Sequence, residues 1–369
     1  MYFKVEDLEF SYGAGSNNIH KFNLNEASGQ LIGIIGVSGC GKSTLLNVLN
    51  GNLTPKGGKV SINGYDIHKE KELLKGVIGY VPQDDMLIKE LTVYQNLYYN
   101  ARLSFRYYTE NMINKVVEDA LVNFDLLEAR DLPVGNTQNT ILSGGQRKRL
   151  NIALELMREP AVLFVDEPTS GLSSSDTEKA MSLLKRQTFK GKLVLAILHQ
   201  PSSDIFKLLD KLMVMDQGGR VIFYGNPVDA LLYFKEASQF VDAQESECIT
   251  CGNINTDQIL RIVEARVVDV NGRLTRKRKT SAQEWYDLYL EKIDSRTKRF
   301  NRPHTNEIPE SNFKVPSMLG QMAVFIKRDI FAKIANKQYL LLKLVHCAVA
   351  GFNPCIFYQA LYPNRRREL

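Results

Sequence analysis

The stretch that decides the fold is the glycine-rich run Gly36-Val37-Ser38-Gly39-Cys40-Gly41-Lys42-Ser43. It fits the pattern G-x-x-x-x-G-K-[ST] at every position. Glycines at this spacing let successive backbone N–H groups turn inward around phosphate oxygens. Leu31–Ile35 before the run reads as a buried strand, and the pattern of Lys42–Leu49 after it predicts a helix whose positive dipole end faces the same place. The sequence therefore predicts a phosphate-binding loop in an α/β fold.

The residues of this loop have separate expected contributions. Lys42 supplies positive charge to the outer phosphates of a nucleotide, and the Ser43 hydroxyl is a candidate magnesium ligand. We expect a nucleotide to be contacted by Gly36, Ser38, Gly39, Cys40, Gly41, Lys42, Ser43 and Thr44.

A second element is the apolar run Val162–Val165, which is followed by Asp166 and Glu167. Four consecutive apolar residues predict a strand buried on both faces that ends at the nucleotide site. Asp166 is expected to hold magnesium through its water shell. Glu167 is the candidate base that orients and activates the attacking water. Taken alone, the stretch also reads as a strand end with two solvated acids.

The third element is Leu142-Ser143-Gly144-Gly145-Gln146, which opens a predicted helix. Small residues before a helix N-terminus form an anion site. This motif resembles the signature motif of ABC ATPases, and it stands at the expected distance before Asp166. In that family the signature motif contacts the γ-phosphate of a nucleotide held by the opposite subunit. The resemblance thus implies a head-to-tail dimer that encloses two ATP molecules, with contacts from Ser143, Gly144, Gly145 and Gln146.

Other positions match the family in the same order along the chain. Tyr12 stands where the family places an aromatic ring on adenine, with Phe10 as the alternative. Gln83 matches the glutamine that reaches magnesium and the attacking water. His199 matches the histidine that contacts the γ-phosphate. The resemblance therefore implies Glu167, His199 and Gln83 as catalytic residues, and Ser43, Gln83 and Asp166 as magnesium ligands.

The loop Ser170-Gly171-Leu172-Ser173 departs from the family, which usually has Asp at the position of Ser173. Asp176 lies nearby in the sequence. This departure puts signalling between subunits through that position in doubt.

Two further runs resemble the G subfamily, which contains half-transporters of the white and multidrug-resistance type. They are Arg147-Lys148-Arg149 and His199-Gln200-Pro201-Ser202-Ser203. In that subfamily the ATPase precedes the membrane domain, and an amphipathic helix connects the two. Apolar residues recur at helical spacing in Met318–Ala335, which fits that connecting helix.

The expected architecture is a P-loop α/β core with an antiparallel β subdomain and an inserted helical subdomain. We expect an ABC nucleotide-binding domain over residues 1–230, with its helical subdomain at about 84–146. A linker or accessory region would follow over 231–315, and the amphipathic connecting helix over 316–337. Residues 338–369 would be the start of a truncated or atypical membrane region.

The C-terminal residues carry conflicting signals. A membrane-spanning helix needs about 20 mostly apolar residues, and Tyr339–Phe352 is interrupted by Lys343 and His346. Asn353-Pro354 then signals a turn. A truncation or a shifted reading frame near Val345 is the first hypothesis. A natural soluble ATPase with an interfacial tail is the alternative.

Composition and cysteine usage indicate a globular protein of a reducing compartment. The chain is 44% hydrophobic and 24% charged, with a formal net charge of +6. Its five cysteines form no disulfide framework, and the N-terminus has no apolar signal region. Cys248 and Cys251 form a C-x-x-C pair without a second pair at zinc-site spacing, so two free thiols are favoured over a zinc site.

Basic runs occur at Arg276–Lys279 and Arg365–Arg367. Such runs can contact nucleic acid or anionic lipid, but a solvated loop is the favoured interpretation of each. We therefore do not expect a nucleic-acid partner.

The predicted function is hydrolysis of ATP with Mg²⁺, coupled to transport across a membrane, in the direction of export. The expected partners are a second ATP-binding cassette and a transmembrane domain, in the same or a separate chain. The expected location is the cytoplasmic face of the inner or plasma membrane. The sequence does not reveal a transported substrate.

A soluble ABC-superfamily ATPase not coupled to transport is the alternative. An ATPase of DNA repair or chromosome structure would carry a coiled-coil insertion, and a translation factor would carry two cassettes; neither feature is present. A third rival, an interaction module with an inactive site, conflicts with the intact Lys42, Asp166 and Glu167.

Overall fold

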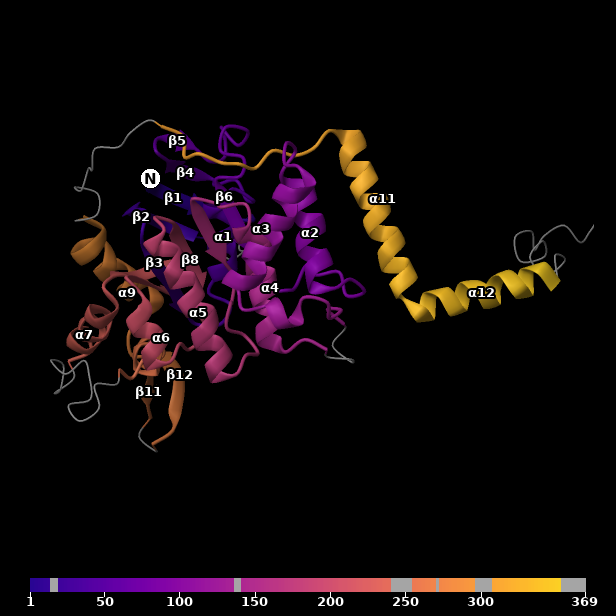
Figure 1. The fold of residues 1–369 in the computed structure, drawn as a ribbon. Coiled ribbons are helices and arrows are strands. Elements are labelled where there is room, and N and C mark those ends of the chain that lie inside the picture. Colours follow the sequence, from indigo (N-terminus) through magenta and orange to yellow (C-terminus); the bar gives the residue numbers. More distant parts are fainter. Residues whose placement is uncertain (14–18, 136–140, 240–253, 270–271, 296–306, 353–369) are drawn as a thin grey trace, which may run out of the picture. The chain divides into compact units, whose positions relative to one another are not determined.

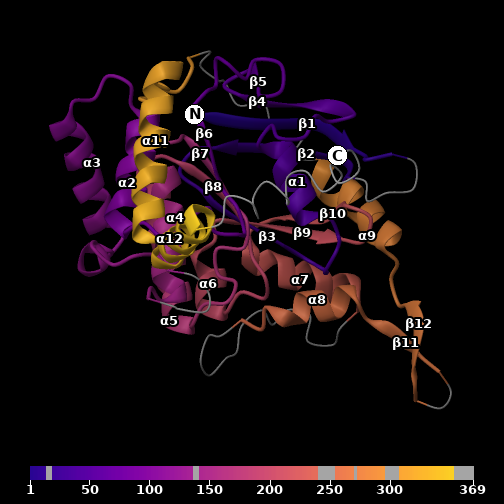
Figure 2. The ribbon, with the colours of Figure 1, turned by 90° about the vertical axis from the view of Figure 1, so that its right-hand side faces the viewer.

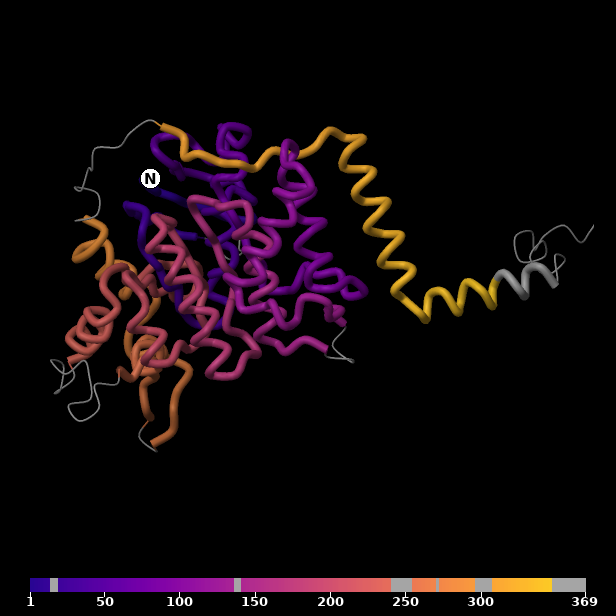
Figure 3. Tube along the Cα trace, in the orientation of Figure 1, coloured from indigo at the N-terminus to yellow at the C-terminus, as the bar shows by residue number. Residues whose placement is uncertain are grey.

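The computed structural model describes residues 1–13, 19–135, 141–239, 254–269, 272–295 and 307–352, with 347–352 described by their backbone alone (Figure 3). The chain divides into two compact units. The first comprises residues 1–86, 123–125 and 143–314, and the second comprises residues 87–122, 126–142 and 315–369.

An antiparallel sheet begins the first unit, as the sequence predicted. Its strand order is β2-β1-β4-β5, with β1 (Tyr2–Phe10), β2 (Ile19–Ala27), β4 (Gly57–Ile62) and β5 (Tyr65–Asp66). In the register, Phe3 lies opposite Glu26 on one side and Ile62 on the other. The turn between β4 and β5 is made by Asn63 and Gly64, which both have positive φ angles. Asn-Gly is the residue pair that such a tight turn favours.

A six-stranded sheet forms the centre of the same unit. Its order is β10-β9-β3-β8-β7-β6, and β10 alone runs antiparallel to its neighbour. Every residue of β7 and β8 is buried, which is expected for parallel strands covered on both faces. The strand bounds are β3 (Leu31–Gly36), β6 (Ile78–Val81), β7 (Val162–Val165), β8 (Leu193–Ile197), β9 (Lys211–Asp216) and β10 (Arg220–Gly225).

Helix α1 (Lys42–Leu49) lies between the two sheets (Figure 2). Its apolar residues share one buried cluster with residues of β1 and β4 from one sheet and of β3 and β8 from the other. Helix α5 (Ser174–Phe189) packs against β3 and β8. The phosphate loop is therefore fixed at both ends, by a buried strand before it and a buried helix after it.

Further elements of this unit follow β10. They are α7 (Pro227–Ala237), α8 (Asp257–Val263), β11 (Arg266–Val268), β12 (Leu274–Arg278), α9 (Ala282–Tyr289) and η2 (Leu290–Asp294) (Figure 1). Helix α9 packs on β10 and buries Trp285 and Tyr289. The Trp285 ring meets the Phe234 ring of α7 edge to face, with centroids 5.1 Å apart. This part of the chain therefore adds to the hydrophobic core.

The basic run Arg276–Lys279 is not the solvated loop that the sequence favoured. Its first three residues belong to β12, which pairs with β11. Nη1 of Arg278 lies 2.7 Å from Oδ1 of Asp216, a carboxylate with no exposed surface. A buried carboxylate needs a paired charge, and this need explains why one member of the run turns inward. The run Arg365–Arg367 lies outside the described residues.

The second unit is helical, and it combines helices from the region of the expected insertion with helices from the C-terminal part of the chain. It contains α2 (Val93–Ser104), most of α3 (Glu110–Asn123), α11 (Met318–Ala335) and α12 (Lys337–Phe352). Thr92 caps α2 in a reciprocal bond with Gln95, and the Thr109 hydroxyl accepts from Met112 N at 3.4 Å. Helix α11 has the bounds that the apolar spacing predicted, and it packs on α2. Within the part of the chain that the structure describes, no helix is long and apolar enough to cross a membrane.

Candidate functional site: a phosphate loop and its surrounding residues

Four loops of the candidate site follow neighbouring parallel strands. Strand β3 leads into the phosphate loop, β8 into His199, β7 into Asp166 and Glu167, and β6 into Gln83. The order β3-β8-β7-β6 places the carboxyl ends of these strands at one edge of the sheet. Ligands of open α/β sheets bind at that edge. The topology therefore brings together residues that the sequence connected only through a resemblance.

Backbone geometry shapes the phosphate loop. A Cβ on Gly36 would collide with a backbone carbonyl of β9, and Gly39 and Gly41 have φ angles of 72° and 103°. Nζ of Lys42 donates to the carbonyls of Gly36 at 2.9 Å and Val37 at 3.1 Å. The ammonium group is thus held over the loop by neutral oxygens, which leaves its charge available to a phosphate.

The side chains of the loop divide between solvent and core. Ser38 and Ser43 are exposed, and Thr44 is half-buried. Cys40 has no exposed surface, and burial raises the pKa of its thiol although the charge of Lys42 opposes the rise. The thiol of Cys40 is therefore not available to a phosphate.

Gln83 and Glu167 meet although 84 positions separate them. Nε2 of Gln83 donates to Oε2 of Glu167 at 3.0 Å. Glu167 has a φ of 47°, a left-handed conformation that is uncommon outside glycine and that concentrates at functional sites. The sequence named both residues, but it did not predict their hydrogen bond or this conformation. A carboxylate oriented by an amide is suited to hold a water molecule in a fixed direction.

Asp166 is buried beside this pair. Burial raises the pKa of its carboxyl; the hydrogen bond with Ser43 opposes the rise, and the neighbouring Glu167 adds to it. Oδ1 of Asp166 is buried and has no hydrogen-bond partner among the described residues. Asp166 thus offers a carboxylate oxygen, Ser43 offers a hydroxyl beside it, and Gln83 offers an amide oxygen from the loop that follows the neighbouring strand. These three oxygen donors are hard, and hard donors fit Mg²⁺.

The predicted signature motif begins helix α4 (Gly144–Leu156). Ser143 caps this helix: its hydroxyl accepts from Gln146 N at 3.1 Å, and Gln146 Oε1 accepts from Ser143 N at 2.9 Å. This reciprocal capping fixes the first turn of a helix whose N-terminus is suited to an anion. The structure thus places the four signature residues at a helix N-terminus, as the sequence predicted.

The run Arg147-Lys148-Arg149 has contacts that the sequence did not predict. Nζ of Lys148 donates to the carbonyl of Gln83 at 3.1 Å, and Nε of Arg147 lies 3.1 Å from Oδ2 of Asp85. Lys148 and Arg149 are both buried. Consecutive residues of a helix point in different directions, so three in a row cannot all lie on the face toward solvent. The sequence therefore indicated that part of this basic run is buried.

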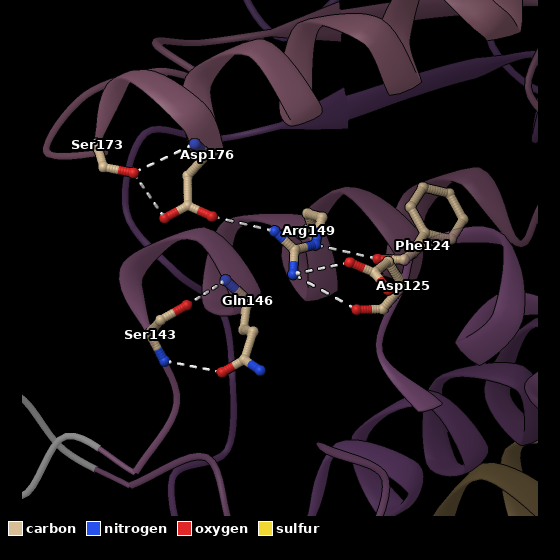
Figure 4. Close-up of polar contacts among 7 residues, drawn as sticks. All are labelled: Phe124, Asp125, Ser143, Gln146, Arg149, Ser173 and Asp176. Carbon is tan, nitrogen blue, oxygen red and sulfur yellow. Dashed lines mark hydrogen bonds and ion pairs between the residues drawn. The ribbon is translucent and has the colours of Figure 1, made fainter. Parts of the chain in front are cut away.

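Ser173, where the family usually has Asp, caps helix α5. Its hydroxyl accepts from Asp176 N at 3.2 Å and donates to Oδ2 of Asp176 at 3.0 Å (Figure 4). Oδ1 of Asp176 lies 3.3 Å from Nη1 of Arg149. The carboxylate nearest to the family position is therefore engaged within its own chain.

Tyr12 and His199 are both available to a ligand. Tyr12 is 58% exposed, and its ring meets that of Phe10 edge to face at 4.8 Å. Tyr12 is thus the exposed ring of the pair and the one that a base can reach, whereas Phe10 is buried. His199 is exposed, and it lines a cavity of about 400 Å³ with Thr169 and Gln200.

No group of three or more His, Cys, Asp or Glu residues suited to a metal ion occurs among the described residues. Cys248 and Cys251, considered above for zinc, lie outside those residues.

Comparisons with known proteins agree with this geometry. Residues 19–170 match the family model described as "ABC transporter". The solved structure of cbiO1 from Clostridium perfringens, described as part of the ABC transporter complex cbiONQ, is 31% identical with a TM-score of 0.55. That match covers 65% of this chain and 95% of cbiO1.

Two relatives carry names of the G subfamily. ABC transporter G family member 13 of Arabidopsis thaliana is 34% identical over 73% of this chain and 41% of its own length. ATP-binding cassette sub-family G member 5 of Mus musculus is 28% identical over 90% of this chain and 50% of its own length. The chain thus spans about half the length, or less, of these relatives.

Proposed function

Because this chain belongs to the ABC transporter family and its relatives belong to the G subfamily, we propose that its ATP hydrolysis drives transport across a membrane, in the direction of export. The chain carries the P-loop nucleotide-binding domain of an ABC-type ATP hydrolase. The proposed location is the cytoplasmic face of the inner or plasma membrane. The proposed partners are a second cassette and a transmembrane domain, in the same or a separate chain.

The observation that carries the proposed site is the hydrogen bond between Gln83 and Glu167. It joins two loops at the edge of the sheet where the phosphate loop also ends. In the proposed reaction, Glu167 accepts a hydrogen bond from the attacking water and Gln83 fixes the orientation of its carboxylate. His199 donates to the γ-phosphate, and Lys42 holds the outer phosphates.

Mg²⁺, held by Ser43, Gln83 and Asp166, would neutralise negative charge on the phosphates. Phosphoryl transfer depends on positioning and charge neutralisation more than on covalent chemistry. The phosphate-loop N–H groups position the nucleotide, and Tyr12 stacks on its adenine. The signature residues Ser143–Gln146 of a second copy would complete each site, so closure of a head-to-tail dimer precedes hydrolysis.

Glu167→Gln tests this function. The substitution keeps the size of the side chain and the possibility of a bond to Gln83, but it removes the base. We expect ATP affinity within about twofold of the original and turnover lowered by at least about 10²-fold. ATP with Mg²⁺ should then trap a dimer, which light scattering after size exclusion would detect.

The matched control is Glu236→Gln, at an exposed position of α7. Glu236→Gln should change neither ATP turnover nor the molecular mass that light scattering measures in the presence of ATP. Undiminished turnover of Glu167→Gln would contradict the assignment of the base. ATPase activity that does not respond to a membrane-embedded partner would instead favour the alternative, a soluble ATPase not coupled to transport.

A further inference from the structure

Asp176 lies three residues after Ser173, the position at which the family usually has Asp. Asp176 is the third residue of helix α5, and its side chain is 26% exposed. Both of its oxygens have partners: Oδ2 accepts from the Ser173 hydroxyl at 3.0 Å, and Oδ1 lies 3.3 Å from Nη1 of Arg149. A carboxylate with both oxygens engaged inside its chain is poorly suited to reach another subunit.

Arg149 is the centre of these contacts (Figure 4). Its side chain is 5% exposed. Besides Asp176, Nε donates to the carbonyl of Phe124 at 3.1 Å, and Nη2 donates to the carbonyl of Asp125 at 3.4 Å. The Asp125 carboxylate lies 3.7 Å from Nη2 but is 77% exposed, so water weakens this pair. Asp176 is therefore the less solvated of the two anions that face the buried guanidinium.

The same carboxylate packs against the signature motif itself. A Cβ built on Gly145 would collide with Oδ1, Cγ and Cβ of Asp176. Gly145 and Arg149 stand four positions apart on α4, so they share one face of that helix. Asp176 thus contacts the first turn of the signature helix at Gly145 and the second turn at Arg149.

We infer that Asp176 is a positioning residue for the signature helix of its own subunit, acting through Arg149 and Gly145 rather than across the dimer interface. This inference rests on the proposed function, in which each signature motif serves the nucleotide of the opposite subunit. The consequence is specific: loss of the Asp176 charge impairs hydrolysis at the partner's phosphate loop and leaves the subunit's own site intact.

Mixed dimers of the full chain, with two different affinity tags, separate these sites. One subunit carries Lys42→Ala, so it contributes a signature motif but no working phosphate loop. The other carries Ser143→Arg, so it contributes a phosphate loop but no working signature. This reference dimer has one complete site, built from the phosphate loop of the second subunit and the signature of the first.

Asp176→Asn is then placed in one subunit at a time. In the signature-donating subunit we expect kcat/KM for ATP to fall about three- to tenfold, because a charge-assisted bond that holds the helix is lost. In the other subunit we expect no change. Arg149→Lys, which keeps the charge but loses the planar fork, should show the same asymmetry with a smaller loss.

Glu178→Gln is the matched control, because it removes one acid from an exposed position of the same helix. It should leave kcat/KM unchanged in either subunit. Thermal unfolding of each variant subunit measures how much stability Asp176→Asn loses relative to Glu178→Gln, since Asp176→Asn leaves the buried Arg149 without its paired charge. A purely structural effect would lower stability and activity together, wherever the variant is placed.

Three results would overturn the inference. They are an equal loss in both placements, a loss confined to the subunit with the working phosphate loop, and no loss in either. An inactive reference dimer, together with inactive unmodified chain, would overturn the proposed function and the inference with it. Active unmodified chain with a symmetric effect of Asp176→Asn would overturn the inference alone.

Discussion

The adjacent carboxylates Asp166 and Glu167 have different surroundings at the end of β7. Asp166 is buried, and one of its oxygens lacks a partner among the described residues, whereas Glu167 is half-buried and bonded to Gln83. A carboxylate with a free buried oxygen is suited to a cation, and one directed by an amide toward partial solvent is suited to a water molecule.

The two glycines of the signature motif should respond differently to alanine. A Cβ on Gly144 would lie 3.5 Å from Leu172, an ordinary contact, whereas one on Gly145 would collide with Asp176. We expect Gly144→Ala to be neutral or slightly stabilising, since alanine favours the helix. Gly145→Ala should lower the free energy of unfolding by about 1–3 kcal/mol, measured by urea denaturation.

The double variant Gly145→Ala, Asp176→Ala shows whether the loss of stability in Gly145→Ala comes from its contact with Asp176. It removes the contacts with Oδ1 and Cγ of Asp176 and leaves only the one with Cβ, so it should recover part of the stability that Gly145→Ala loses. Equal stability of Gly144→Ala and Gly145→Ala would contradict the packing described for Asp176.

Lys148 should affect turnover without taking part in nucleotide binding. Its ammonium holds the carbonyl of Gln83, whose side chain directs Glu167. Burial lowers the pKa of Lys148, and nearby carboxylates, Asp85 first among them, oppose the shift. We expect Lys148→Met to lower kcat by about tenfold and to leave ATP affinity within about twofold.

The exposed Lys179→Met is the control for this variant. A parallel loss of affinity and turnover in Lys148→Met would show instead that the lysine acts on the nucleotide site as a whole.

How much of the site the sequence predicted depends on how local each contact is. The phosphate loop and the start of the signature helix are each made within a few residues, so their residue types predict them. The bonds of Gln83 to Glu167 and of Arg149 to Asp176 join segments that only the folded sheet brings together. A spacing pattern contains no information on these distances, and Arg149 therefore went unassigned.

At the scale of elements, buried strands were the easiest to predict. Val162–Val165 forms a strand with the predicted bounds, because it is a short run of apolar residues in a covered sheet. The region after Gly225 was harder. The burial of α9 depends on Phe234 of α7 and on β10, and no pattern within α9 identifies those partners.

Helix α11 should associate with lipid. Met318, Leu319, Ile326 and Ile334 are each more than half exposed, and Lys327, Arg328 and Lys333 lie on the same helix. Exposed apolar residues with basic neighbours favour anionic membrane surfaces. We expect the chain to float with vesicles that contain phosphatidylserine, and Ile326→Glu to lower the bound fraction several-fold.

Gln321→Glu is the matched control, since it adds the same charge at a polar position of α11. It should reduce vesicle binding much less than Ile326→Glu. Equal effects of the two variants would mean that net charge, and not the apolar surface of α11, governs the association.

At the scale of the whole molecule, side-chain contacts bear on the C-terminal limit of the nucleotide-binding domain. The boundary at residue 230 stays a prediction, and the packing of α9 supports a later one. Tyr286 donates to the carbonyl of Lys21 at 2.8 Å, and Asn23 donates to the buried Asp294 carboxylate at 3.0 Å. Both bonds connect α9 and η2 to strand β2. We therefore propose that the folding unit extends to about residue 295.

Trp285 allows this proposal to be tested directly, because it is the only tryptophan of the chain and is 1% exposed. If α9 belongs to the folding unit, tryptophan fluorescence should show an apolar environment, and its urea transition should coincide with the loss of far-ultraviolet circular dichroism. Phe234→Ala, which removes the ring against Trp285, should lower the free energy of unfolding by about 3–5 kcal/mol and shift both transitions together. If α9 belonged to a linker, Trp285 would emit as a solvent-exposed residue, or its fluorescence transition would occur at a lower urea concentration than the unfolding of the sheets. In that case the domain would end near residue 230, and the contacts of α9 with β2 would contribute nothing measurable to its stability.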